Sequence, residues 1–409
     1  MRTFRTSIAT ALCALAAAAV SCEKIRTPQS GELTGEEKEM KAIVEQYVPN
    51  VIYSIYADLA RESSELYELL KAAAEKETAS LSQTELEAIA EKFLQARQSW
   101  EESEAFLFGA ATDFGIDPHI DTWPLDVDAL ATSLSNADQV EQLRGEEGIL
   151  YAGGKLGKEL LGFHGIEFVI FRNGEVRKAA ELNAKETDPA FGRYDVSGKQ
   201  ELIYAAAVAG DLRDNCWQLC ASWNEDCEKE YTERCEELEV NVTVTGSERS
   251  YGRNMLGAAS AGSSYASWQE AIGSILIAGC SNICNEVANV KMGNAHTGED
   301  INYIESPYSK KSFQDFIDNI LSIQYSLYGK SGATTAGSAS IMSYLRNHGY
   351  QGVSALEESL ENTLKALRTC QSKGAFVDIY ADDSVQAAMD AANSLDAQLN
   401  QAASWIVLQ

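Results

Sequence analysis

The stretch Gly162-Phe163-His164-Gly165-Ile166-Glu167 places an imidazole and a carboxylate three residues apart. On a helix, residues three positions apart lie on one face, one turn from each other. Glu and His side chains at this spacing bind metal ions in helical bundles. Two ligands do not make a metal site, so other parts of the chain would have to supply the remaining ones.

The composition is that of a globular chain with an excess of acidic residues. Of 409 residues, 45% are hydrophobic, and 61 acidic residues outnumber 33 basic ones, for a formal net charge of −28. Nucleic acid is therefore excluded as an expected partner, because phosphate binding needs a basic surface. The acidity fits either simple solubility or attraction of cations, and solubility is the simpler explanation. Only 6 prolines are present, which indicates long uninterrupted helices.

The N-terminal residues have the features of a targeting segment. The apolar run from Ile8 to Val20 follows a short basic region and is short for a membrane span. It leads into Ala19-Val20-Ser21-Cys22, which resembles a bacterial lipobox. We expect a lipoprotein signal peptide over residues 1–21, a lipid on Cys22 and a polar tether over residues 22–38. The alternative is an ordinary signal peptide with an incidental cysteine.

Apolar residues recur at three- and four-residue steps along most of the remaining chain, as in amphipathic helices. The predicted helices cover 38–75 with an interruption at Pro49, Thr84 towards Phe108, 198–235, a stretch beginning near Met255, 312–327, 338–346, 354–370 and 383–407. We therefore expect an all-α protein with two helical bundles, residues 39–235 and 255–409. Residues 236–254 are expected to form a hinge or an insertion between them.

Residues 110–128 break the helical pattern and are expected to be irregular. The residues that precede Pro118 and Pro124 are disfavoured in helices. The segment carries several carboxylates, including Asp121, and the aromatic Trp123. A loop so rich in acidic and aromatic groups, far from either terminus, is more often functional than a simple connection.

The residues after Glu167 give conflicting signals. The run from Phe168 to Phe171, followed by Asn173-Gly174, fits a strand and a hairpin turn. The His164 and Glu167 pair, in contrast, shares one face only on a helix. Taken by themselves, these residues leave both alternatives open.

Four stretches, in order along the chain, resemble the signatures of imelysin-like proteins. Gly162 to Glu167 resembles the family's GxHxxE signature, and Trp100 to Gly109 resembles the Trp/Glu/Phe/Gly segment upstream of it. Ile120 to Leu125 looks like its Trp-Pro loop, and Glu305 to Gly329 is similar to its C-terminal segment. The resemblance implies two helical bundles with the GxHxxE segment near their junction, as a helix kinked around Gly162 or Gly165.

The resemblance also implies competing functions. Imelysin-like proteins lie on bacterial envelopes, some are linked to iron uptake or regulation, and one branch is named for insulin-cleaving peptidase activity. We expect an envelope lipoprotein, periplasmic or on the outer-membrane surface, that binds a metal ion or a metal chelate. Envelope transport proteins are further expected partners. The alternatives are a zinc-type metallopeptidase and a surface interaction module without catalysis.

The candidate site combines residues from the matched stretches. The predicted metal ligands are His164, Glu167, Glu104 and Asp121, and the predicted ligand-binding residues are Trp123, Tyr308 and Ser309. An imidazole with carboxylates suits iron or another divalent metal. The chain lacks the His-Glu-x-x-His pattern of helical zinc peptidases, so we assign no catalytic residue and expect binding rather than catalysis.

A purely structural role is the alternative for the central pair. In that case His164 and Glu167 form buried hydrogen bonds that lock two helices, and Trp123 serves as packing. The cysteines give a second open question. Seven of them lie between Cys216 and Cys370, and export permits disulfides. Disulfides between nearby helices and buried free thiols are equally compatible with the sequence.

Overall fold

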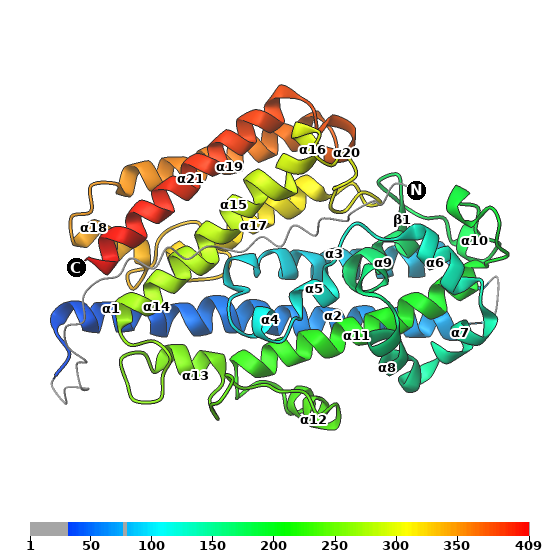
Figure 1. The fold of residues 1–409 in the computed structure, drawn as a ribbon, viewed down its shortest axis with the longest axis horizontal. Coiled ribbons are helices and arrows are strands. Elements are labelled where there is room, and N and C mark those ends of the chain that lie inside the picture. Colours follow the sequence, from blue (N-terminus) through cyan, green and yellow to red (C-terminus); the bar gives the residue numbers. More distant parts are fainter. Residues whose placement is uncertain (1–31, 77–79, 409) are drawn as a thin grey trace, which may run out of the picture. The chain divides into compact units, whose positions relative to one another are not determined.

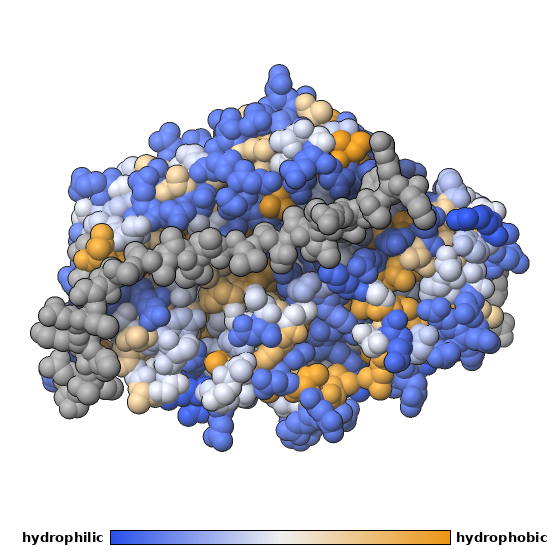
Figure 2. Space-filling view, in the orientation of Figure 1, coloured by the Kyte–Doolittle hydropathy of each residue, from blue (hydrophilic) through white to orange (hydrophobic). Residues whose placement is uncertain are grey.

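The computed structural model describes residues 32–76 and 80–408, and the chain from Leu33 onward forms one compact unit. The predicted signal peptide, Cys22 and most of the predicted tether lie outside the described residues. Helices account for nearly all regular structure in the described part, and the strands found there are two residues long (Figure 1). The all-α prediction is confirmed. The face in Figure 2 is largely hydrophilic, in line with the charged composition.

The first long helices are α1 (Gly35–Tyr47), α2 (Ser54–Glu75) and α3 (Gln83–Glu101). A π-helical segment, Val48–Tyr53, joins α1 to α2 and contains Pro49, so the predicted interruption is confirmed. Thr34 and Ser82 each begin a helix with a capping box, in which the hydroxyl and a glutamate satisfy free backbone groups. Helix α2 packs between α3 and α11.

Short helices follow α3. They are a 3-10 turn (Glu104–Phe106), α4 (Ala110–Asp113), α5 (Asp117–Ile120), α6 (Val127–Leu134), α7 (Ala137–Gln142), α8 (Gly145–Lys155) and a 3-10 turn (Lys158–Leu160). The expectation of a fully irregular segment over 110–128 was wrong. Pro118 lies in the first turn of α5, where a missing N–H costs nothing. Helix α3 ends at Glu101, whereas the sequence predicted a helix that continues towards Phe108. Just after this end, the Ser103 hydroxyl donates to the carbonyl of Trp100.

The two alternatives for the residues after Gly162, a helix and a strand with a hairpin turn, both occur, one after the other. Helix α9 covers Gly162–Ile170, and β1 (Phe171–Arg172) pairs with β2 (Glu175–Val176) in a small antiparallel hairpin. Asn173 and Gly174 have φ of 53° and 87°, as a tight hairpin turn requires. Gly162 has φ of 65°, and a side chain there would overlap the carbonyl of Ile120. The resemblance implied a helix kinked around Gly162 or Gly165, whereas α9 begins at Gly162 and continues through Gly165 to Ile170.

The predicted helix over 198–235 is two helices. After α10 (Ala179–Leu182) and a 3-10 turn (Pro189–Phe191) come α11 (Gly198–Trp223), α12 (Lys229–Glu237) and α13 (Tyr251–Leu256). Asn224 ends α11 because its side chain accepts a hydrogen bond from the backbone of Asp226 and favours a turn.

A long apolar helical run covers Trp268–Thr297. It consists of α14 (Trp268–Ser274), a π segment (Ile275–Ser281), α15 (Asn282–Glu286), a second π segment (Val287–Lys291) and α16 (Gly293–Thr297). Its length and composition would suffice to cross a membrane, but 67% of its most apolar window is buried inside the protein. Burial of this kind marks a core helix.

The C-terminal helices are α17 (Ser312–Tyr328), α18 (Ile341–Asn347), α19 (Val353–Lys373), α20 (Phe376–Ile379) and α21 (Asp383–Val407). Helices α19 and α21 lie side by side, and α17 packs against both α19 and α3 (Figure 1). The contact between α17 and α3 brings the C-terminal helices against the N-terminal ones, which positions the site. The cysteines from Cys216 to Cys370 are free thiols.

Candidate functional site

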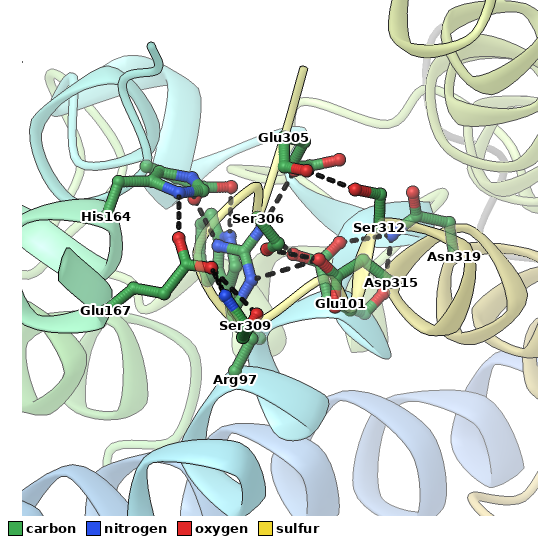
Figure 3. A network of polar contacts seen from close by, with 12 residues as sticks. Arg97, Glu101, His164, Glu167, Glu305, Ser306, Ser309, Ser312, Asp315 and Asn319 are labelled. Atoms are coloured by element: carbon green, nitrogen blue, oxygen red, sulfur yellow. Dashed lines mark hydrogen bonds and ion pairs between the residues drawn. The ribbon is translucent and has the colours of Figure 1, made fainter. Parts of the chain in front are cut away.

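Arg97 on α3 lies at the centre of a buried network of charged side chains (Figure 3). Its side chain is 3% exposed, and its guanidinium forms ion pairs with Glu101 and Asp121. The same guanidinium lies 2.7 Å from Glu305 Oε1 and 3.9 Å from Asp315 Oδ2. These carboxylates come from α3, the end of α5, the turn before α17 and α17 itself, so the network joins segments distant in sequence.

Lys291 supplies a second buried cation. Its ammonium lies 3.2 Å from Glu305, 3.6 Å from Glu101 and 3.7 Å from Glu104. The carboxylates paired with these two cations are Glu101, Glu104, Asp121, Glu305 and Asp315. Five carboxyl groups therefore share two permanent cations, so burial favours the protonated form of some of them.

His164, on α9, contacts the network through Asp121. Its Nε2 lies 3.0 Å from Asp121 Oδ1, and its Nδ1 lies 3.4 Å from Glu167 Oε2. Burial disfavours the imidazolium, but the hydrogen bonds to Asp121 and Glu167 outweigh it and raise the pKa of His164 to about 9. Both ring nitrogens thus donate at neutral pH. Trp100 Nε1 donates to the other Asp121 oxygen over 2.8 Å, which fixes this carboxylate.

Glu167 connects α9 to the turn before α17. Its Oε1 accepts from the backbone N–H groups of Tyr308 and Ser309, at 3.1 and 2.7 Å, and from the Ser309 hydroxyl at 2.7 Å. The Tyr308 ring packs edge-on against Phe168, with centroids 5.0 Å apart. These contacts are the helix-locking arrangement that the sequence left open as the structural alternative. They hold Glu167, Tyr308 and Ser309 together away from the cavity.

A polar cavity of about 270 Å³ adjoins the network. Its walls are Glu104, Leu107, Asp117, Pro118, Asp121, Thr122, Trp123, Lys158, Glu286, Lys291 and Tyr303. Three of the predicted site residues, Glu104, Asp121 and Trp123, therefore meet at one opening. The Trp123 ring packs on Tyr303, with centroids 4.0 Å apart, and contacts the His164 ring at 6.5 Å.

Burial favours the neutral forms of two of the cavity acids, Asp117 and Glu104. Burial, together with Asp121 and Glu286, raises the pKa of Asp117 to about 7. Burial raises the pKa of Glu104 well above its usual range, although Lys291 opposes it. Behind them, burial raises the pKa of Glu305 to about 7. Asp121 is the exception, because Arg97 and His164 outweigh its burial and lower its pKa.

Among the described residues, two groups of three side chains could hold a cation, because the donor atoms within each group all lie within 4.8 Å of one another. They are Asp121, His164 and Glu305, and Glu101, Glu104 and Asp121. In the first group, His164 already binds Asp121, and Arg97 bridges Asp121 and Glu305. The second group is paired as well, with Arg97 on Glu101 and Asp121 and with Lys291 near Glu101 and Glu104. It differs in that Glu104 and Asp121 also line the cavity, where Asp117 adds a further oxygen donor. Glu305 Oε2 is buried without a hydrogen-bond partner among the described residues, so the network has unused acceptor capacity.

The two cations, Arg97 and Lys291, were not among the predicted site residues. Arg97 lies four residues after Phe93 and three before Trp100, on the same apolar face of α3, and a charged residue there was a usable signal. Lys291 lies in the apolar run that contains Val287 and is 2% exposed. Both positions interrupt core faces that were predicted to be apolar.

A family model for imelysin matches residues 52–402 of the chain. The chain belongs to the imelysin family. Among curated relatives, the imelysin chain is 25% identical over 276 residues to Iron-regulated protein A of Synechococcus elongatus. This alignment covers 68% of the chain and 61% of that relative, so the chain spans about three fifths of the relative's length.

Solved structures show the same fold. The imelysin chain superposes with a TM-score of 0.72 on a putative iron-regulated protein A precursor from Parabacteroides distasonis, at 22% identity over 92% of this chain and 96% of that one. It superposes with a TM-score of 0.50 on an imelysin-like protein from Psychrobacter arcticum, at 14% identity over 92% and 94% of the two chains. At these identities the comparison establishes the fold alone.

Proposed function

We propose that this imelysin-family protein is a lipid-anchored protein of the bacterial cell envelope that binds a metal ion or a metal-bearing ligand for iron acquisition. The binding place is the cavity lined by Glu104, Asp117 and Asp121. The observation that carries the proposal is the excess of carboxyl groups beside this cavity, where five of them, some held neutral by burial, surround Arg97, Lys291 and the protonated His164. A bound cation would allow the neutral carboxyl groups to ionise and bind it.

The chemistry of the donors supports a hard or borderline cation. Carboxylate oxygens from Glu104, Asp117 and Asp121 suit iron and similar ions better than soft metals. His164 and Trp100 hold Asp121 in place by hydrogen bonds, the role that groups behind metal ligands commonly have. The name of the Synechococcus relative, Iron-regulated protein A, favours iron among these ions.

Equilibrium dialysis with Fe²⁺ under anaerobic conditions tests the site. The untagged wild-type protein should retain one ion per chain at micromolar concentrations. Glu104→Gln removes one cavity carboxylate at constant size and should lower the affinity at least about tenfold. Glu87→Gln, on the exposed face of α3, is the matched control and should bind like the wild type. Equal binding by all three proteins would refute the proposal.

The anchor is tested separately because it concerns residues outside the described part. Cells that express the full chain should incorporate labelled fatty acid into the wild type and not into Cys22→Ser. Incorporation into both proteins, or into neither, would contradict lipidation at Cys22.

The metallopeptidase alternative predicts a different result. Cleavage of an unfolded protein that is sensitive to chelator and abolished by Glu167→Ala would establish it. The interaction-module alternative predicts that His164→Ala/Glu167→Ala lowers the melting temperature and leaves the function of the protein unchanged.

A further inference from the structure

A second cavity, of about 420 Å³, lies between the end of α2, the start of α8 and the first turns of α11. Apolar side chains form its inner wall, namely Tyr67, Leu143, Ile149, Ile203, Ala206 and Ala207. Ala206 and Ala207 are small, which leaves the space open beside Ile149 and Ile203. The cavity shares no lining residue with the acidic one. Its size and apolar walls are typical of small-molecule sites.

The charged residues that line this second cavity are mostly basic, although the chain as a whole is acidic. Lys71, Lys76, Arg144 and Lys199 line it, against the single carboxylate of Glu75. The whole chain carries a formal charge of −28, so a cavity edge with four cations is a local reversal. A concentration of one sign of charge beside low-dielectric walls attracts ligands of the opposite sign.

Lys76 forms an ion pair with Glu85 over 2.6 Å, whereas the other cations at the edge keep donors available. Lys71 is 3.9 Å from Glu146, and Arg144 is held by Glu141 through Nε, which leaves its other guanidinium nitrogens free of that contact. Lys199 donates to the carbonyls at the end of α2 and forms no ion pair with a carboxylate among the described residues. Burial, and to a lesser extent the neighbouring Arg144, lower the pKa of Lys199, while Glu75 opposes this shift.

We propose that this second cavity binds a small amphipathic anion, whose carboxylate or phosphate contacts Arg144 and Lys199 and whose apolar part packs on Ile149, Ile203 and Ala206. Charge-assisted hydrogen bonds hold the head group, and burial of the apolar part supplies the remaining affinity. A free fatty acid and an anionic phospholipid share this chemistry.

Calorimetric titration of the full chain with decanoate, decyl phosphate, decanol and inorganic phosphate tests the proposal. Decanoate and decyl phosphate should bind, decanol at least about tenfold more weakly, and inorganic phosphate not measurably. Decanol binding as tight as that of decanoate would overturn the anionic site. Competition of decanoate by phosphatidylglycerol vesicles, and not by phosphatidylcholine vesicles, identifies a lipid head group as the source; no competition identifies a free anion.

Two substitutions place the ligand. Ala206→Trp fills the cavity and should abolish decanoate binding, whereas the matched Ala387→Trp, on the exposed face of α21, should not. Arg144→Glu changes a half-exposed residue at the edge and should weaken decanoate binding about tenfold. Its control is Lys229→Glu, at a side chain that is 84% exposed. Wild-type affinity in both Ala206→Trp and Arg144→Glu would overturn the proposal, and Arg144→Glu remains informative if Ala206→Trp fails to fold.

Discussion

His164 is the residue whose protonation links the acids of the network to the GxHxxE helix. Its pKa, raised to about 9 in the folded protein, exceeds the value of an unfolded histidine. The resulting stabilisation is complete below about pH 6.5 and disappears as the pH rises through about 9.

Metal-free wild type should therefore lose on the order of 2–3 kcal/mol of unfolding free energy, relative to His164→Gln, between pH 6.5 and 9.5. Urea denaturation in the presence of a chelator at several pH values measures this difference. Because His164→Gln leaves the other titrating acids in place, their contributions largely cancel. Parallel pH profiles of the two proteins would show that His164 is neutral in the folded state.

Substitution of Glu167 should lower the stability of the protein, whereas substitution of Glu104 should lower its affinity for metal. Glu167→Gln replaces an acceptor of His164 Nδ1 by a donor, which should cost about 1–3 kcal/mol of unfolding free energy. The same variant should retain metal, because Glu167 does not line the acidic cavity. Chemical denaturation and metal analysis of one preparation check both effects. Loss of metal from well-folded Glu167→Gln would make Glu167 a ligand.

The sequence predicted part of this residue-level arrangement. The spacing of His164 and Glu167 and the matched stretches identified Glu104, Asp121 and Trp123, which do meet at one cavity. Spacing could not show that Glu167 points at backbone N–H groups some 140 residues further along the chain, since that contact depends on how α9 meets the turn before α17.

At the level of helices, the packing of α9 on α11 depends on glycine. A Cβ at Gly165 would overlap the hydroxyl of Tyr204, which donates to the carbonyl of Leu160 over 2.7 Å. The second glycine of the GxHxxE stretch therefore allows α11 to approach α9. Gly154 on α8 has open space around its α-carbon and offers a comparison.

Gly165→Ala should cost about 1–3 kcal/mol by overpacking, and Tyr204→Phe about 1 kcal/mol by loss of its hydrogen bond. The double variant should be less destabilised than the sum, because Tyr204→Phe removes the overlapping atom. Gly154→Ala should be neutral or slightly stabilising. Denaturation of the wild type, Gly165→Ala, Tyr204→Phe and their double variant gives the coupling energy. A coupling energy of zero would mean that the helices adjust without contact.

The boundaries of the helices could be predicted only in part from the sequence. Periodicity predicted the long helices but not the one-turn helix α5. Proline disfavours a helical conformation in the residue before it, but Pro118 lies in the first turn of α5, where its missing N–H is tolerated. The break after Trp223 was missed as well, because Asn224 ends α11 by a side-chain contact within a polar stretch. Such local hydrogen bonds are not encoded in apolar spacing.

At the level of the whole molecule, cation binding should be linked to proton release. Asp117 has a pKa raised to about 7, and that of Glu104 is raised further above its usual range. These acids are protonated below pH 7, and a cation must displace their protons. The affinity for Fe²⁺ should therefore rise from pH 6 to pH 8, by roughly tenfold per pH unit for each proton displaced.

Anaerobic calorimetry in two buffers with different ionisation enthalpies measures the number of protons released. Asp117→Asn should reduce this number, whereas Glu87→Gln should not. An affinity that does not change with pH would contradict the participation of these acids.

The convergence of the network is the property that the sequence could not supply. Arg97, Asp121, Lys291, Glu305 and Asp315 come from five separate segments, and their proximity depends on the contact between α3 and α17. The division into bundles over 39–235 and 255–409 stays a prediction.

Anomalous X-ray scattering at the iron edge, from crystals of the untagged protein exposed to Fe²⁺, would locate the ion directly. The proposed function predicts one strong peak in the acidic cavity, within bonding distance of the carboxylates of Glu104 and Asp121. A cavity without a peak at full iron exposure, with Glu104 and Asp121 still in place, would contradict it.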